Sequence, residues 1–146
     1  MALNIRPLTP DDFTAWQGLW MNYLAFYETR VEENIYHTTF ARLISDTHPN
    51  QNALIAVLDN RAVGLVHYIY HPHNWKIEDV TYLQDLYASP EARGIGVGRA
   101  LIEAVYAAAD ANGTPNVYWL TQDFNETARQ LYDRIAQKTP FIKYNR

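Results

Sequence analysis

The sequence predicts one α/β domain, in which helices flank a twisted, mixed β-sheet. Short runs rich in branched and aromatic residues alternate with segments of helical periodicity. A glycine-rich turn joins one such run to a long amphipathic helix. The 146 residues are 48% hydrophobic and 19% charged, which is typical of a globular chain. That length suffices for a single domain over residues 1–146 to bury most of its apolar surface.

The N-terminal part predicts a strand followed by two helices. Residues 3–8 are expected to form the strand. Thr9 and Pro10 mark a helix start, because threonine caps helices and proline suits the first turn. A second helix is expected over residues 38–45. The apolar stripe of the first helix consists of Phe13, Trp16, Trp20, Tyr23, Leu24 and Tyr27.

Two strands are expected next, over residues 53–58 and 62–70, with a hairpin signal at Asp59-Asn60-Arg61. A third strand over residues 80–87 ends before Pro90. The helix after the glycine turn closes at Asn112-Gly113, and its apolar stripe is Val97, Leu101, Ala104, Val105 and Ala108. The remaining expected elements are a strand over residues 116–121, a helix over 125–137 and a strand over 141–144.

The glycine-rich turn predicts a phosphate-binding loop. Gly94, Gly96 and Gly98 stand at alternate positions where a helix begins, so backbone N–H groups lie free of side-chain cover at the positive end of a helix dipole. A P-loop is excluded because Gly98 is followed by Arg99 and Ala100. A dinucleotide fingerprint is excluded because its third glycine would come one residue later.

Two motifs give the chain a family resemblance. Residues 93–98 match the Arg/Gln-x-x-Gly-x-Gly/Ala signature of the GCN5-related N-acetyltransferases, known as GNAT enzymes. Residues 125–132 resemble the next motif of that family, Asn-x-x-Ala-x-x-Leu/Phe-Tyr. The resemblance is strongest over residues 64–144, and most similar to the branch of spermidine/spermine, histone-tail and D-amino-acid acetyltransferases. It implies the GNAT fold, with a central sheet splayed in the middle where acetyl-CoA enters.

The resemblance also implies which residues bind acetyl-CoA. Leu86, Tyr87 and Ala88 would lie along the pantetheine arm, with backbone groups acting like a neighbouring strand. Asn125 would hydrogen-bond to pantetheine or CoA, although its position is equally typical of a helix N-cap. A β-bulge near residues 84–86 would expose an N–H group for the thioester oxygen. The pyrophosphate would be held by Arg93, Gly94, Ile95, Gly96, Val97, Gly98 and Arg99.

The implied reaction moves an acetyl group from acetyl-CoA to a primary amine. An alkylammonium ion has a pKa of about 10.4, so removing its proton at pH 7 requires roughly 4.6 kcal/mol. No cysteine is present, which favours direct transfer in a ternary complex over a cysteine acyl-enzyme. Tyr132 is the expected acid for the departing thiolate, since the family often places a tyrosine beside the CoA sulfur. The alternative for Tyr132 is a core tyrosine whose hydroxyl finds a backbone partner.

The general base is harder to assign. Several relatives in this branch carry glutamate where Gln84 stands, and an amide cannot accept a proton at neutral pH. Asp85 follows it, but alternation along a strand would point its side chain to the opposite face. A water relay along the open sheet is therefore favoured. The other candidate carboxylates, each more typical of a solvated surface, are Glu28, Glu32, Glu78 and Asp79.

The expected acceptor is a polyamine, a small amine, an amino acid or a lysine side chain of a peptide. Aromatic faces beside carboxylates suit such a cation, and the candidate residues are Tyr27, Glu28, Trp75, Gln84 and Asp85. Alternatively, these aromatics are core and loop residues. His71 and His73 lack a third ligand at a known spacing, so no metal is expected. The net charge of −4 gives no support for nucleic-acid binding.

Composition also indicates the expected cellular location of the protein. The chain has no cysteine for disulfides, no apolar run of 18 residues for a membrane span and no signal-peptide pattern at its start, so a cytoplasmic protein is expected. The resemblance implies a homodimer, formed through residues 141–146. A different class of function stays open, because a CoA-binding regulator or sensor without catalysis would share the loop.

Overall fold

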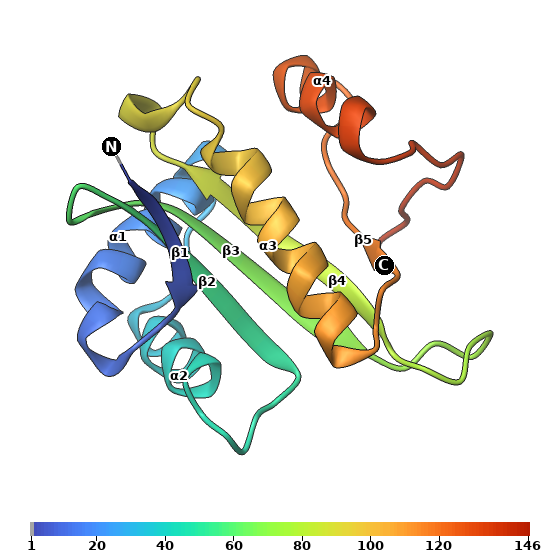
Figure 1. Cartoon of the computed structure of the whole chain (residues 1–146), viewed down its shortest axis with the longest axis horizontal. Helices are drawn as coiled ribbons and strands as arrows, with labels where there is room; N and C mark the ends of the chain where they lie inside the picture. Colours follow the sequence, from blue (N-terminus) through green and yellow to red (C-terminus); the bar gives the residue numbers. More distant parts are fainter. Residues whose placement is uncertain (1) are drawn as a thin grey trace.

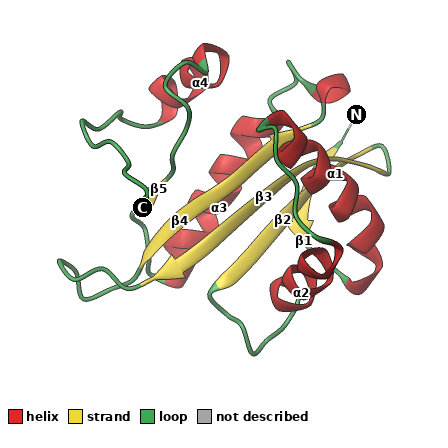
Figure 2. Cartoon of the chain, turned by 180° about the vertical axis from the view of Figure 1, so that it is seen from behind, coloured by secondary structure: helices red, strands yellow, loops and turns green. Residues whose placement is uncertain are grey.

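A computed structural model describes residues 2–146 as a five-stranded sheet with helices on both faces (Figures 1 and 2). Met1, part of the expected domain range, lies outside the described residues. The strands are β1 (Leu3–Pro7), β2 (Gln51–Leu58), β3 (Arg61–His71), β4 (Val80–Ala88) and β5 (Val117–Tyr118). The helices are η1 (Pro10–Asp12), α1 (Phe13–Phe26), α2 (Glu33–Leu43), η2 (Pro90–Ala92), α3 (Val97–Asn112) and α4 (Glu126–Ile135).

The sheet has the order β1-β2-β3-β4-β5, and β1 to β4 are antiparallel. β5 runs parallel to β4 and is paired with it at Thr81↔Val117 and Tyr82↔Tyr118. β4 continues to Ala88, so its last six residues, 83–88, extend past the described pairing with β5. The expected splay in the middle of the sheet is therefore confirmed. α4, at the end of the chain in Figure 1, is held to α3 by the Tyr106 hydroxyl, which donates to the Ile135 backbone oxygen at 3.1 Å.

The hairpin between β2 and β3 forms where the sequence predicts it. Asp59 and Asn60 have positive φ angles of 50° and 64°. Two consecutive left-handed residues make the tight turn whose twist suits antiparallel strands, and aspartate and asparagine tolerate that conformation. This turn fixes the β2–β3 register, and through it the position of the long β3 strand on which the site is built.

Each face of the sheet has its own core. α1 and α2 cover one face, as Figure 2 shows, with Trp16 and Phe40 packed on Ile55 and Leu65. α3 covers the other face, where its fully buried side chains are Val97, Leu101, Ile102, Val105 and Ala109. The α3 stripe is thus close to the one that the sequence predicts, because helical periodicity places these residues on one side.

Three elements differ from the sequence prediction. α2 begins at Glu33 rather than at residue 38, since Tyr36 and Phe40 are one turn apart and both buried against the sheet. β5 has two residues instead of six. The strand expected over residues 141–144 is wrong. Phe141, Ile142 and Tyr144 are at least 76% exposed, and no strand among residues 2–146 pairs with this segment, so water satisfies its backbone groups.

The N-terminal strand is tied to η1 by a charge pair. Arg6 donates to both carboxylate oxygens of Asp12, at 2.7 and 3.0 Å, and the backbone N–H of Thr9 donates to Asp12 Oδ2 at 2.7 Å. These bonds lower the pKa of Asp12 to about 2, the Arg6 hydrogen bond being the largest cause. No helix within residues 2–146 is long and apolar enough to cross a membrane.

Candidate functional site

The glycine loop presents a row of backbone N–H groups at the start of α3. Gly94 and Gly96 have φ angles of +86° and +83°, which only glycine adopts without strain, and Gly96 is the N-cap of the helix. Within the described chain, no hydrogen-bond acceptor is found for the backbone N–H groups of residues 94–99. A Cβ at either glycine would meet nothing within 4 Å, so the loop borders open space. This arrangement suits a phosphate-bearing ligand.

Two arginines flank this loop, and both are exposed. Arg93 Nε lies 3.4 Å from the backbone oxygen of Ala88, at the end of β4. Arg99 Nε is paired with Glu103 Oε1 at 2.7 Å along the surface of α3. Each guanidinium therefore keeps further N–H donors free for an anion in the loop.

A small cavity of about 20 Å³ lies where β4 and β5 separate. Tyr132, on α4, lines it, and its ring packs edge-on against Trp119 with 5.4 Å between ring centroids. Burial raises the pKa of Tyr132 to about 12, and the neighbouring Tyr27 adds to the shift. Tyr132 is thus a neutral hydroxyl donor at any physiological pH. The other residues lining this cavity are Tyr23, Tyr27, Leu83, Gln84, Leu86, Trp119 and Leu120.

β4 carries a bulge beside this cavity. Asp85 is opposite His67 and Leu83 is opposite Tyr68, which leaves Gln84 as the extra residue. The bulge falls within the range expected from the sequence. It also corrects the expectation that Gln84 and Asp85 point to opposite faces, because the extra residue interrupts the alternation and both side chains line one cavity.

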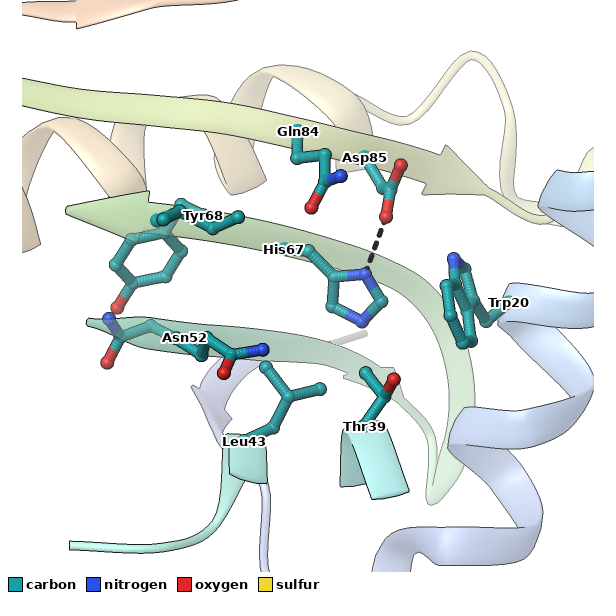
Figure 3. Close-up of a pocket in the computed structure, with 10 residues that line it drawn as sticks. Trp20, Thr39, Leu43, Asn52, His67, Tyr68, Gln84 and Asp85 are labelled. Carbon is teal, nitrogen blue, oxygen red and sulfur yellow. Dashed lines mark hydrogen bonds and ion pairs between the residues drawn. The ribbon is translucent and has the colours of Figure 1, made fainter. Parts of the chain in front are cut away.

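That second cavity, of about 160 Å³, opens on the α1–α2 face of the sheet, and Figure 3 shows Gln84 and Asp85 reaching into it from β4. Gln84 lines both cavities, and no other described residue does. Two ligands placed in them would therefore meet at the bulge. The remaining residues around the larger cavity are Trp20, Thr39, Leu43, Gln51, Asn52, His67, Tyr68 and Ile69.

His67, which sequence reasoning missed, forms the floor of the larger cavity. Its Nδ1 lies 2.7 Å from Asp85 Oδ2, and the indole Nε1–H of Trp16 donates to its Nε2 at 2.9 Å. His67 is 4% exposed and Trp16 fully buried. The sequence carried one signal for this trio, a histidine in the middle of the otherwise apolar β3 run.

A further donor beside the larger cavity has no partner. The indole N–H of Trp20 is buried and finds no hydrogen-bond acceptor among the described residues. Trp20 packs edge-on against His67, with 5.2 Å between ring centroids. A buried donor without a partner costs roughly 1–3 kcal/mol, so an acceptor atom supplied by a ligand would bind there with advantage.

The other residues singled out in the sequence lie at different distances from the bulge. Tyr27 lines the smaller cavity, and burial raises its pKa. Asn125 caps α4, its Oδ1 accepting from the Ala128 N–H at 3.4 Å. Tyr87 packs against the α1–α2 core. Neither Glu28 nor Trp75 lines either cavity, and Trp75 is 88% exposed in the loop after β3.

The histidine pair of that loop is engaged in local contacts. His71 lies 2.7 Å from the Tyr118 hydroxyl, and His73 accepts from the Trp75 backbone N–H. In the part of the chain that the structure describes, no three histidine, cysteine or acidic side chains gather as metal ligands would.

The chain is similar in sequence to known acetyltransferases. The sequence profile of the acetyltransferase (GNAT) family matches residues 13–136. D-amino-acid N-acetyltransferase HPA3 from Saccharomyces cerevisiae is 41% identical over 97% of this chain and 89% of its own. Thialysine N-epsilon-acetyltransferase from Bos taurus is 30% identical over 72% of this chain and 57% of its own.

Solved structures share the fold at lower sequence identity. A ribosomal-protein-alanine N-acetyltransferase from Brucella melitensis superimposes with a TM-score of 0.82 and 23% identity, covering 99% of this chain and 98% of that one. The aminoglycoside N-acetyltransferase AAC(6')-Iy, solved with CoA, gives a TM-score of 0.84 and 17% identity over 99% of this chain and 94% of that one.

Proposed function

Because the chain belongs to the acetyltransferase (GNAT) family, we propose that it acetylates the amine of an amino acid or a closely related small molecule by direct transfer from acetyl-CoA. The observation that carries this proposal is the bulge at Gln84, which borders both cavities. An acyl donor at the splay and an amine in the larger cavity would come within reach of each other there. Proximity of this kind supplies much of the rate in a two-substrate reaction.

In this proposal the glycine loop and the end of β4 hold acetyl-CoA, whose thioester supplies the acetyl group. The free N–H groups of residues 94–99 take the pyrophosphate, with Arg93 and Arg99 adding charge. The unpaired edge of β4 lies beside the pantetheine arm, at Leu86, Tyr87 and Ala88. Asn125 keeps its capping bond and presents its amide N–H₂ group to the same arm.

Tyr132 acts on the leaving sulfur. Its raised pKa of about 12 keeps the hydroxyl protonated, as a donor must be. A thiol resembles cysteine, with a pKa of about 8.5, so a complete proton transfer from Tyr132 is unfavourable. The hydroxyl therefore stabilises the thiolate mainly by donating a hydrogen bond as the C–S bond breaks, and solvent completes the protonation.

The amine gives up two protons on the other side of the bulge. The ammonium loses the first to solvent before it attacks, and it loses the second as the C–N bond forms and its N–H becomes more acidic. Asp85, 14% exposed at the side chain, holds the ammonium and receives this second proton directly or through water. Gln84 orients the amine by hydrogen bonding, since an amide cannot take a proton.

An amino acid suits the larger cavity better than a polyamine does. The unpartnered Trp20 N–H calls for an acceptor oxygen, which a carboxylate supplies and a polyamine lacks. Asp85 supplies the complementary charge for the ammonium. The relatives named above as D-amino-acid and thialysine acetyltransferases favour the same class, and they favour an enzyme over a non-catalytic CoA-binding module.

The test compares acceptors with a carboxylate and acceptors without one. Release of CoA from acetyl-CoA is followed with D- and L-phenylalanine, with phenethylamine and with spermidine. We expect kcat/KM for one enantiomer of phenylalanine to exceed that for phenethylamine by at least about tenfold, equal to 1.4 kcal/mol. Trp20→Phe should remove most of this preference, while the affinity for CoA stays unchanged.

Equal rates with phenethylamine and both amino acids would contradict an amino-acid acceptor. Binding of CoA without turnover of any amine, in the wild-type protein, would instead support the non-catalytic module. Leu43→Val serves as the matched control for Trp20→Phe, because it trims the same cavity without touching a hydrogen-bond donor.

A further inference from the structure

We infer that His67 is a positioning residue, which the Trp16 indole holds as the neutral Nδ1–H tautomer so that it fixes the Asp85 carboxylate toward the acceptor amine. The inference rests on the proposed function of Asp85. It adds two buried residues to the site, neither of which needs to touch a substrate.

The tautomer follows from the hydrogen-bond partners. An indole N–H can only donate, so the Nε2 atom that lies 2.9 Å from Trp16 Nε1 must carry a lone pair. The proton of a neutral imidazole then resides on Nδ1, which lies 2.7 Å from Asp85 Oδ2 and donates to it. The Trp16 contact therefore selects the Nδ1–H tautomer over the Nε2–H tautomer, in which two N–H groups would face each other.

The surroundings of His67 leave Asp85 as the single charged group against it among residues 2–146. On the β2 side its register partner is Ala53, and from α1 the packed side chains are Trp16 and Trp20. The titratable groups next in line are Tyr23 on α1, beside Asp85, and Tyr36 on α2, which packs against both indoles. Burial raises the pKa of each of these tyrosines, so both are neutral.

The consequence for Asp85 concerns orientation and charge. One carboxylate oxygen is fixed by a neutral donor, which cannot neutralise it as an imidazolium would. The carboxylate thus keeps its negative charge and its remaining lone pairs for the ammonium of the acceptor. The contact also holds the side chain at a bulge, where the regular ladder no longer fixes its direction.

The first experiment observes the tautomer itself. In a long-range ¹H–¹⁵N spectrum of the wild-type protein at pH 7, the His67 Nδ1 should be protonated, and Nε2 should show the shift of an unprotonated nitrogen. Trp16→Phe removes the donor that selects this tautomer, so the Nε2–H form should appear in the spectrum of that variant. An Nε2–H tautomer or an imidazolium in the wild type at pH 7 would overturn the inference, whatever the enzyme acetylates.

The second experiment measures kinetics. His67→Leu removes the donor and should lower kcat/KM for the acceptor by about 10- to 100-fold, with CoA affinity unchanged. This is the loss typical of removing a residue that orients a functional side chain by a hydrogen bond, as measured for the partners of metal-binding residues. His67→Asn, whose amide N–H₂ can replace Nδ1–H, should recover most of that loss. Ile55→Val, in the same core, controls for packing and should leave kcat/KM unchanged.

The two proposals fail in different ways. If His67→Leu and His67→Asn lose activity equally and in step with their stability, His67 is only structural. If Asp85→Asn retains the wild-type kcat/KM for the acceptor, the proposed role of Asp85 is wrong, even where the spectrum shows the Nδ1–H tautomer.

Discussion

Gly64 on β3 lies directly beneath Val97, the first residue of α3. A Cβ at position 64 would stand 2.7 Å from Val97 Cγ1 and 3.1 Å from the backbone oxygen of Tyr87. The first distance is shorter than real contacts allow, and the second atom belongs to a strand that cannot move freely. The start of α3, and with it the row of free N–H groups, is therefore set by the absence of a side chain at Gly64.

Gly64→Ala should consequently push α3 away from the sheet. We expect a loss of about 1–3 kcal/mol in the free energy of unfolding, typical of overpacking, together with weaker CoA binding. Urea denaturation and calorimetric titration with CoA measure the two effects. Gly18→Ala is the matched control, since Gly18 is an exposed helical residue with no atom within 4 Å of its added Cβ. It should stabilise the protein slightly, and unchanged stability in Gly64→Ala would contradict this view of the helix contact.

Gly96→Glu tests the phosphate-binding loop. The side chain would be forced into a left-handed backbone conformation, at a cost of about 1–2 kcal/mol, and would place a negative charge beside the pyrophosphate. We expect the Kd for CoA to rise by at least about tenfold, or 1.4 kcal/mol. Gly18→Glu adds the same charge in α1 and should leave the Kd unchanged. Equal CoA affinity in both variants would contradict the proposal that this loop binds the pyrophosphate of CoA.

Tyr132→Phe tests the role of the hydroxyl group. Loss of a donor to the leaving sulfur should reduce kcat by about 10²-fold, the lower end of the range for removing one hydrogen-bond donor to a developing anion, with little change in the Kd for CoA. Tyr106→Phe, on α3, is the control, because the Tyr106 hydroxyl donates to the Ile135 backbone oxygen at the end of α4 and lines neither cavity. A full wild-type kcat in Tyr132→Phe would refute the assignment.

The rate should also remain high in alkaline solution. Burial raises the pKa of Tyr132 to about 12, so the neutral donor persists up to that pH. Between about pH 7 and 10 the acceptor amine loses its proton, and kcat/KM should rise and then level off. A decline centred near pH 10, the ordinary tyrosine pKa, would show that the hydroxyl titrates normally and would count against a buried donor.

Asp12→Asn should destabilise the protein in a pH-dependent way. The pKa of Asp12 is depressed to about 2 in the folded chain, chiefly by Arg6, against about 3.9 when unfolded. The ionised form therefore stabilises the fold above about pH 4, and this contribution disappears as the pH falls towards 2. We expect a loss of about 1–2 kcal/mol at pH 7, since Arg6 is 35% exposed and screened, and almost none at pH 2.

Thermal unfolding at both pH values measures this difference. Asp11→Asn, in the same turn, is the control, because Asp11 is exposed and its carboxylate makes no hydrogen bond or ion pair in the described chain. A destabilisation by Asp12→Asn that is equally large at pH 2 and pH 7 would mean that packing, and not the charge pair, accounts for it.

Much of this protein can be predicted from its residues alone. The stripe of α3 and the hairpin turn follow from periodicity and turn chemistry, which are local properties, because a helix or a turn depends on residues a few positions apart. The splayed sheet and the bulge were expected only through the family resemblance that two short motifs carry. The earlier start of α2 can be predicted in the same way, since Tyr36 and Phe40 have helical spacing. The strand expected at residues 141–144 failed because a strand also needs a neighbour, and the described chain provides none there.

The acceptor side of the site was decided by tertiary structure. His67 and Asp85 are 18 residues apart, and Trp16 is 51 residues from His67, so no local pattern connects them. Only the β3–β4 register sets His67 opposite Asp85, and only the bulge turns Gln84 and Asp85 toward one cavity. The sequence by itself determined the helices, the hairpin turn and the glycine loop, because each is written in a contiguous segment. The tertiary structure determined which carboxylate reaches the larger cavity, because that depends on the register between strands.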